Sequence, residues 1–350
     1  MPRTLLGVQA GRGVAALLVV LYHAERALAL PQYVGHPPLA GITAFGHAGV
    51  DFFFVLSGFI ICYIHRRDLG HPGALGRYAR ARISRIYPPY WAVTAALIAI
   101  GIAAHGAGSV PGPSHLVQTL LLAPGSQPPI LGVAWTLVHE MEFYLLFGLA
   151  ILDWRLAAAG VLAYATLGWA PLPDWAAPLR FWGAGWYDTL FAVGIGAAWT
   201  TRRVPLPRPR TVALLGATAF LLAGLAEDAG LLPIEGPAGR LAYGLAAASV
   251  IVGLTQAEFT GRLQVAPAFA MLGAASYSIY LVHSPMLGYA ARAMLMAGLL
   301  PRLPAWLVMA VAVTAAVAAG LAFHRWIERP LTTAARRWVE RTAGMTASPQ

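Results

Sequence analysis

The chain has 350 residues, of which 58% are hydrophobic and only 11% are charged. A soluble domain carries roughly 25% charged residues, so this composition excludes an ordinary soluble globular protein and indicates a polytopic membrane protein. The formal charge of +10 does not indicate a nucleic-acid partner, because the basic residues cluster between apolar segments, which is typical of membrane topology.

Ten apolar segments are long enough to predict an all-α protein of about ten transmembrane helices. They lie near 8–29, 46–65, 83–104, 132–152, 155–171, 187–201, 211–227, 239–256, 272–297 and 304–326. On this model, 19 of the 24 basic residues fall on one side, and the other side holds Arg26, Arg180, Arg240, Arg292 and Arg302. The positive-inside rule then places both termini in the cytoplasm, with anionic membrane lipid or a phosphorylated ligand as a secondary partner.

The remaining organisation is simple. We expect one membrane domain over residues 1–341 and a disordered tail over 342–350. Segment 105–131 contains no acidic or basic residue and is rich in proline and glycine, which predicts a loop on or folded back into the outer face.

The first apolar segment contains Arg12 and His23, eleven residues apart. At ~100° per residue this spacing returns to nearly the same helix face, ~16 Å further along the axis. Polar groups inside hydrocarbon are costly, so the pair indicates a functional site. The alternative is an interfacial arginine and a histidine hydrogen-bonded to a neighbouring helix.

Two further segments carry charges near their ends. Asp51 lies near the outer mouth of the second segment, and Gly58 in its middle predicts close helix packing. Arg82 and Arg85 share a face at the start of the third segment and suit a phosphate-bearing ligand, or are plain topogenic charge. Pro88 and Pro89 then predict a kink or entry corner.

The fourth segment begins with WTLVHEMEFY. Helical spacing places Trp135, His139 and Glu142 on one face, and Glu140 with Tyr144 on another. A carboxylate there needs a partner or solvent at the headgroup level, and it is suited to orient His23 as a general base.

The ninth segment carries a polar stripe. Ser276, Tyr280 and His283 share one face of an otherwise apolar helix, a pattern typical of interhelical hydrogen bonds or of a substrate contact.

No metal site is expected. The ten histidines are scattered, without an HExxH pair. The single cysteine, Cys62, allows no intramolecular disulfide and no thiolate metal site.

Taken together, these segments resemble the acyltransferase-3 family of integral membrane O-acyltransferases. The resemblance rests on Arg12 with His23, GVDFFFVLSGF at 49–59, Arg82 and Arg85 with the following IYP, WTLVHEMEFY at 135–144, SYSIYLVH at 276–283 and ERP at 328–330. It covers nearly the whole chain in the expected order. The chain departs from the family pattern at His139 and at Met141–Glu142, where the family often has Glu-Gln.

The resemblance implies an O-acyltransferase in the cytoplasmic membrane that moves an acyl group, most simply acetyl, from cytosolic acyl-CoA to a carbohydrate or glycolipid hydroxyl. It implies His23 and Glu140 as catalytic residues, and Arg12, Arg82 and Arg85 as contacts of the donor phosphates. Asp51, Tyr144, Ser276, Tyr280 and His283 are expected to bind substrate or to have structural roles. A direct transfer and an acyl-enzyme relay both remain open.

Two expectations concern partners and alternatives. No extracytoplasmic esterase-like domain is recognised in the sequence, so the membrane unit is expected to act alone or with a separate periplasmic partner. The alternative to an enzyme is a transporter or flippase of a glycolipid or acylated lipid, which would not consume acyl-CoA. The sequence does not give the acceptor, the acyl chain length or the oligomeric state.

Overall fold

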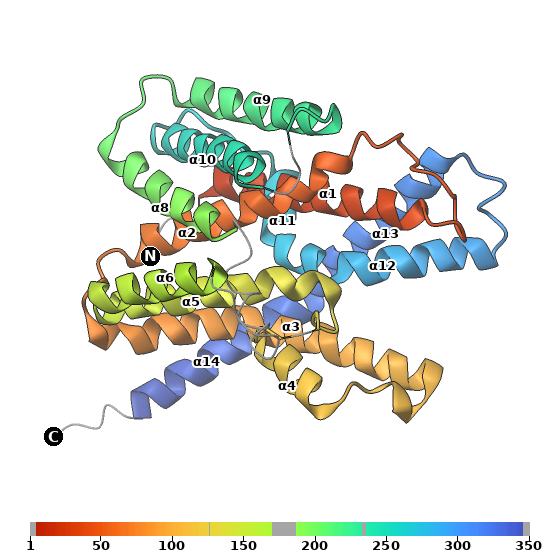
Figure 1. The fold of residues 1–350 in the computed structure, drawn as a ribbon, viewed down its shortest axis with the longest axis horizontal. Coiled ribbons are helices and arrows are strands. Elements are labelled where there is room, and N and C mark those ends of the chain that lie inside the picture. The colour runs from red at the N-terminus through yellow and green to blue at the C-terminus, as the bar shows by residue number, and fades with distance from the viewer. Residues whose placement is uncertain (1–4, 126, 170–186, 233–235, 346–350) are drawn as a thin grey trace. The chain divides into compact units, whose positions relative to one another are not determined.

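The computed structural model describes residues 5–125, 127–169, 187–232 and 236–345. Every regular element among these residues is a helix, which confirms the all-α prediction (Figure 1).

All ten predicted segments are helical where they are described. The bounds are α1 Leu6–Leu28, α2 Gly49–His65 preceded by the 3-10 turn η1 Ala44–Ala48, α3 Leu75–His105, α5 Trp135–Leu152, α6 Trp154–Trp169, α8 Tyr187–Arg203, α9 Pro209–Asp228, α10 Pro237–Phe259, α11 Pro267–Ala274 followed by α12 Ser276–Met296, and α13 Ala305–Phe323. Residues 170 and 171 of the fifth segment lie outside the described residues.

Among the described residues, seven helical stretches are long and apolar enough to cross a membrane. Those at α6 and α8 are shorter, with 16 and 17 residues, than the roughly 20 that a bilayer requires. Helix α12 has 21 residues, but its polar stripe lowers its hydropathy. The chain is therefore a multi-pass membrane protein.

Helix α3 corrects one expectation. It begins at Leu75 rather than near residue 83, so Pro88 and Pro89 lie inside the helix and not at its entry. The arginine-rich first turns of α3 are helical and are anchored by their buried residues, Tyr78 and Ser84, which precede the buried Ile86. A search for apolar runs misses such a start, since Arg77, Arg80 and Arg82 interrupt the apolar positions there.

The segment 105–131 is also more ordered than a loop. It contains α4, Pro113–Leu121, which ends at Leu122 in the left-handed conformation. Three aromatic side chains of α3 donate hydrogen bonds to carbonyls at the end of α4: Tyr90 to Thr119 (2.8 Å), Trp91 to Leu120 (2.8 Å) and Tyr87 to Leu121 (2.9 Å). These bonds bring side-chain donors to the last carbonyls of the helix, where intrahelical donors run out.

The C-terminal region continues through a π-helical turn, His324–Glu328, into α14, Arg329–Met345, which packs against α3. Helix α14 therefore covers the first four residues of the tail that we expected to be unstructured from residue 342. The rest of that tail lies outside the described residues.

Contacts divide the chain into two compact units, and each is described by itself. The first comprises residues 1–64 and 186–322, and the second comprises residues 65–185 and 323–350. The prediction of a single domain over 1–341 stays a prediction.

Helix α1 is central to the first unit. It packs against η1, α10, α11 and α12, and α10 packs beside α8 and α9 (Figure 1). Its buried residues include Val20, Ala24 and Leu28, which join an apolar core with α12 and α13.

Glycines allow the closest helix contacts of this unit. A Cβ at Gly273 of α11 would lie 1.9 Å from the Gln9 carbonyl oxygen of α1, and one at Gly58 of α2 would lie 2.2 Å from the Phe191 carbonyl oxygen of α8. Because no side chain fits there, the prediction that Gly58 permits close packing is confirmed.

Candidate active site

His23 lies in the fifth turn of α1 and is half-buried. Its Nδ1 is 2.9 Å from the carbonyl oxygen of Val19. A carbonyl only accepts hydrogen bonds, so Nδ1 carries the proton and Nε2 is left as the basic nitrogen. The sequence predicted that a glutamate orients the His23 ring, but in the structure the hydrogen-bond partner of Nδ1 is a backbone carbonyl.

A second histidine lies against the first. The ring of His283 on α12 is 4.9 Å from the ring of His23, in an edge-to-face arrangement. Its Nδ1 donates to the carbonyl oxygen of Tyr280 at 2.6 Å, and its buried Nε2 has no hydrogen-bond partner among the described residues. The sequence placed His283 on a polar stripe but did not pair it with His23.

The rest of that stripe is also buried. Ser276 and His283 have no exposed surface, and the Tyr280 side chain is 8% exposed. The Ser276 hydroxyl has no hydrogen-bond partner among the described residues. The centroid of the Tyr280 ring lies 5.6 Å from that of the His283 ring and 6.2 Å from that of the Phe53 ring. This packing supports a structural role for Tyr280, whereas Ser276 Oγ and His283 Nε2 are buried polar atoms without a hydrogen-bond partner among the described residues.

A network that the sequence analysis missed continues from His23. The Tyr22 ring contacts the rings of His23 (5.0 Å) and His47 (5.7 Å). His47 Nε2 is 2.7 Å from Glu227 Oε1, and Tyr243 donates to Glu227 Oε2 at 2.7 Å. The adjacent acidic residues Glu227 and Asp228, at the end of the apolar segment 211–227, were the available signal.

Asp51 has a structural partner. It is fully buried, and Arg240 Nη1 donates to both of its carboxylate oxygens, at 3.0 and 2.8 Å. Arg240 Nη2 also donates to the Tyr187 hydroxyl at 2.9 Å. Both oxygens of this buried carboxylate accept from the same arginine nitrogen, which leaves little capacity for a substrate, so the structural alternative for Asp51 is favoured. Sequence reasoning counted Arg240 only as a topology signal.

Arg12 lies eleven residues before His23 on α1 and is half-buried. Its proposed contact with the donor phosphates stays a prediction.

The second unit holds the predicted arginine pair. Arg82 and Arg85 of α3 are half-buried, and neither forms an ion pair with a described residue. The Arg82 guanidinium carbon is 5.8 Å from the centre of the Tyr144 ring, and its buried Nε has no hydrogen-bond partner among the residues described. A half-buried guanidinium with an unused N–H suits an anionic ligand.

Tyr144 connects this arginine to Glu140. The Tyr144 hydroxyl donates to Glu140 Oε1, so the two residues interact one helical turn apart, as the predicted shared face requires. The Tyr78 hydroxyl of α3 donates to the Tyr144 backbone carbonyl at 3.1 Å and joins the two helices. Because Glu140 and His23 belong to different units, the proposed pairing between them stays a prediction.

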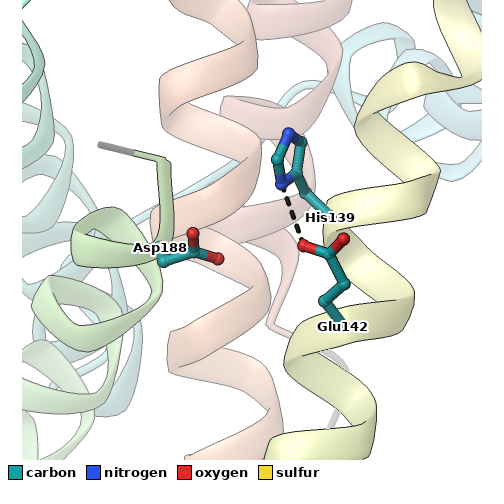
Figure 2. Close-up of side chains that lie close together, drawn as sticks. All are labelled: His139, Glu142 and Asp188. Carbon is teal, nitrogen blue, oxygen red and sulfur yellow. Dashed lines mark hydrogen bonds and ion pairs between the residues drawn. The ribbon is translucent and has the colours of Figure 1, made fainter. Parts of the chain in front are cut away.

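The other predicted face of α5 is also confirmed. Figure 2 shows the side chains of His139 and Glu142 turned toward one another, with His139 Nδ1 3.1 Å from Glu142 Oε2. The Trp135 ring contacts the His139 ring at 5.8 Å. The expectation of no metal stays a prediction.

Comparison with known proteins decides the family. A family model described as an acyltransferase domain, acyltransferase-3, matches residues 5–325. The chain belongs to the acyltransferase-3 family. It is therefore a membrane acyltransferase, and this membership favours the enzyme over the transporter or flippase.

Two curated relatives of this family member are similar in sequence. The exopolysaccharide production protein ExoZ of Rhizobium meliloti (strain 1021) is 32% identical over 318 residues, which cover 86% of this chain and 95% of that protein. Protein 2 in picA locus of Rhizobium radiobacter is 38% identical over 81 residues, which cover 23% of this chain and 36% of that protein. No solved structure gives a significant match.

Proposed function

We propose that this acyltransferase moves an acyl group, most simply acetyl, from cytosolic acyl-CoA to a hydroxyl of an exopolysaccharide or its glycolipid precursor at the outer face of the cytoplasmic membrane. The observation that carries the proposal is His23, whose Nδ1 is bound to a backbone carbonyl and whose Nε2 is directed to act as a base. The printed name of the relative from Rhizobium meliloti supports the polysaccharide acceptor.

The proposed chemistry is a direct transfer. His23 Nε2 takes the proton of the acceptor hydroxyl, and the oxygen attacks the thioester carbonyl carbon. The tetrahedral intermediate collapses as the carbon–sulfur bond breaks, and the CoA thiolate takes the proton back from Nε2. General base catalysis of this kind contributes typically ~10²–10⁴-fold.

The donor would be held by arginines. Arg82 and Arg85 are half-buried cations without ion-pair partners among the described residues, which suits the phosphates of CoA. We place Arg12 near the same cytoplasmic side, with the acyl thioester extending along the bundle toward His23. Glu140 would act near Arg82, because the Tyr144 hydroxyl donates to Glu140 and the Tyr144 ring lies against the Arg82 guanidinium.

The test is acetyl-CoA turnover by the protein purified in nanodiscs, with exopolysaccharide fragments as acceptors. We expect His23→Ala to abolish acetyl transfer, while His71→Ala stays active, because His71 is exposed and its ring bonds to the nearby backbone carbonyl of Leu69. We expect Arg82→Gln and Arg85→Gln to raise the KM for acetyl-CoA by about tenfold each, as loss of a charge-assisted hydrogen bond predicts.

Full transfer activity in His23→Ala would contradict the mechanism. An unchanged KM for acetyl-CoA in both arginine variants would remove these residues from the donor site. Gel filtration of each variant establishes that the folded protein is retained.

A further inference from the structure

A pocket of about 350 Å³ opens at the C-terminal end of α1 in the first unit. Its lining residues come from α1 and from the connection that leads to η1: Tyr22, Glu25, Arg26, Ala29, Pro37, Gly41 and Ala44. This volume lies at the lower end of the roughly 300–1,000 Å³ of small-molecule sites. It therefore suits a small ligand.

Glu25 fixes the connection that lines one part of the pocket. This buried carboxylate accepts hydrogen bonds from the backbone N–H groups of Leu39 (3.1 Å), Gly41 (2.8 Å) and Thr43 (3.2 Å), and from the Thr43 hydroxyl. Four donors on one carboxylate hold the connection in place before any ligand arrives. Such preorganisation lowers the entropy lost on binding.

Two other lining residues, Tyr22 and Arg26, carry unused polar groups. The exposed Arg26 guanidinium lies 5.5 Å from the centre of the Tyr22 ring. Neither the Tyr22 hydroxyl nor the Arg26 guanidinium has a hydrogen-bond partner among the residues that the structure describes. An aromatic surface beside several free donors is suited to a ligand with an apolar face and many hydroxyls.

The pocket is next to the proposed base. Tyr22 lines it, and the Tyr22 ring is 5.0 Å from the His23 ring. A ligand bound there lies one side chain away from the group that we propose activates the acceptor.

The charges around the pocket are mainly negative. Glu25 lies in the wall, Glu227 binds His47 behind Tyr22, and Asp228 interacts electrostatically with both Glu25 and Glu227. Among the described residues, these three carboxylates outnumber the one guanidinium that lines the pocket, that of Arg26. An anionic ligand would be repelled, while an uncharged ligand would not.

We infer that this pocket binds an uncharged sugar residue of the acceptor, with Tyr22 packing against the sugar ring and Arg26 donating to its hydroxyls, and that it discriminates against sugars bearing a carboxylate. The inference rests on the proposed transfer to a carbohydrate, and it assigns the acceptor site and the acceptor's charge.

The experiment measures sugar binding without any acyl-CoA. Saturation-transfer NMR on the protein in zwitterionic nanodiscs compares methyl β-glucoside with methyl β-glucuronide, so that lipid charge does not repel the second probe. We expect the glucuronide to bind about tenfold more weakly than the glucoside, as one unfavourable charge contact predicts.

Two variants test the pocket itself. Tyr22→Ala removes the ring, and Ala29→Trp fills the space without removing a polar group. We expect each to weaken glucoside binding about tenfold, the effect of losing roughly one ring contact and one hydrogen bond. The matched control is Tyr63→Ala, because Tyr63 and Arg202 form a similar pair, 4.3 Å apart, outside the pocket lining.

The outcomes separate this inference from the proposed function. Glucuronide binding as strong as glucoside binding overturns the charge selection, and unchanged binding in both pocket variants overturns the site. A wild-type protein that transfers acetyl to polysaccharide but binds no glucoside also overturns the site, while the function stands. Glucoside binding that depends on Tyr22, without any CoA release from acetyl-CoA, supports the pocket and overturns the function.

Discussion

The imidazoles of His23 and His283 have the same hydrogen-bonding pattern at Nδ1. Each donates from Nδ1 to a backbone carbonyl of its own helix, so each presents Nε2 as an acceptor. In His283 that nitrogen is fully buried without a partner among the described residues, and such a group costs about 1–3 kcal/mol. We interpret His283 Nε2 as an acceptor whose missing hydrogen bond is supplied by a bound ligand.

His283→Phe tests this interpretation. Phenylalanine keeps the ring that packs against His23 but removes the Nε2 acceptor. We expect kcat to fall about tenfold, the loss of one hydrogen bond of about 1.5 kcal/mol, and thermal stability to stay equal or rise. Acetyl transfer assays and thermal unfolding in detergent measure the two effects. Unchanged kcat would show that the ring only packs.

At the scale of helices, α1 gains its close contacts from small residues on its neighbours. Gly273 of α11 contacts the α1 backbone at Gln9, and the α11 backbone lies against Gly13 of α1. Helices in lipid lack the hydrophobic drive that packs soluble bundles, so backbone proximity and dispersion contacts are what hold them together. The position of His23 depends on this packing, because α1 also carries the imidazole.

Gly273→Ala is expected to destabilise the protein. The added Cβ would lie 1.9 Å from the Gln9 carbonyl oxygen, so α1 and α11 must separate, at a cost of about 1–3 kcal/mol. The matched control is Gly196→Ala on α8, where a Cβ meets nothing within 4 Å and helix propensity improves by about 1 kcal/mol. Thermal unfolding of both variants should give shifts of opposite sign. A higher melting temperature for Gly273→Ala would contradict the packing argument.

At the scale of the whole molecule, the proposed reaction requires access from both sides of the membrane. On the ten-helix model, the proposed donor contacts Arg12, Arg82 and Arg85 lie on the side that holds most of the basic residues. The proposed acceptor pocket lies at the opposite end of α1 from Arg12. The ten-helix model, with both termini in the cytoplasm, puts these two features on opposite faces.

Labelling of single cysteines tests that topology. Cys62 is buried, so it gives a low background for a membrane-impermeant maleimide. We expect Leu231→Cys and Val110→Cys to react in intact cells, and Val204→Cys to react only after the cells are opened. All three residues are exposed. Reaction of Val204→Cys in intact cells would contradict the ten-helix topology, in which six crossings precede this residue.

The sequence determined the class of the protein and most of its elements. Apolar run length identified all ten helical positions, and helical spacing identified the faces that join His139 to Glu142 and Glu140 to Tyr144. These features are local, since they depend on residues within one or a few turns. The start of α3 was missed because its buried residues lie among arginines.

Only the tertiary structure decided which side chains from distant segments meet. His283 lies 260 residues from His23, and Glu227 lies 180 residues from His47. Asp51 looked equally suited to a substrate or to a structural role until Arg240, 189 residues away, was found against it. Spacing along one helix contains no information on such pairs, because they depend on how helices pack, and in this protein backbone-to-backbone contacts at glycines set that packing.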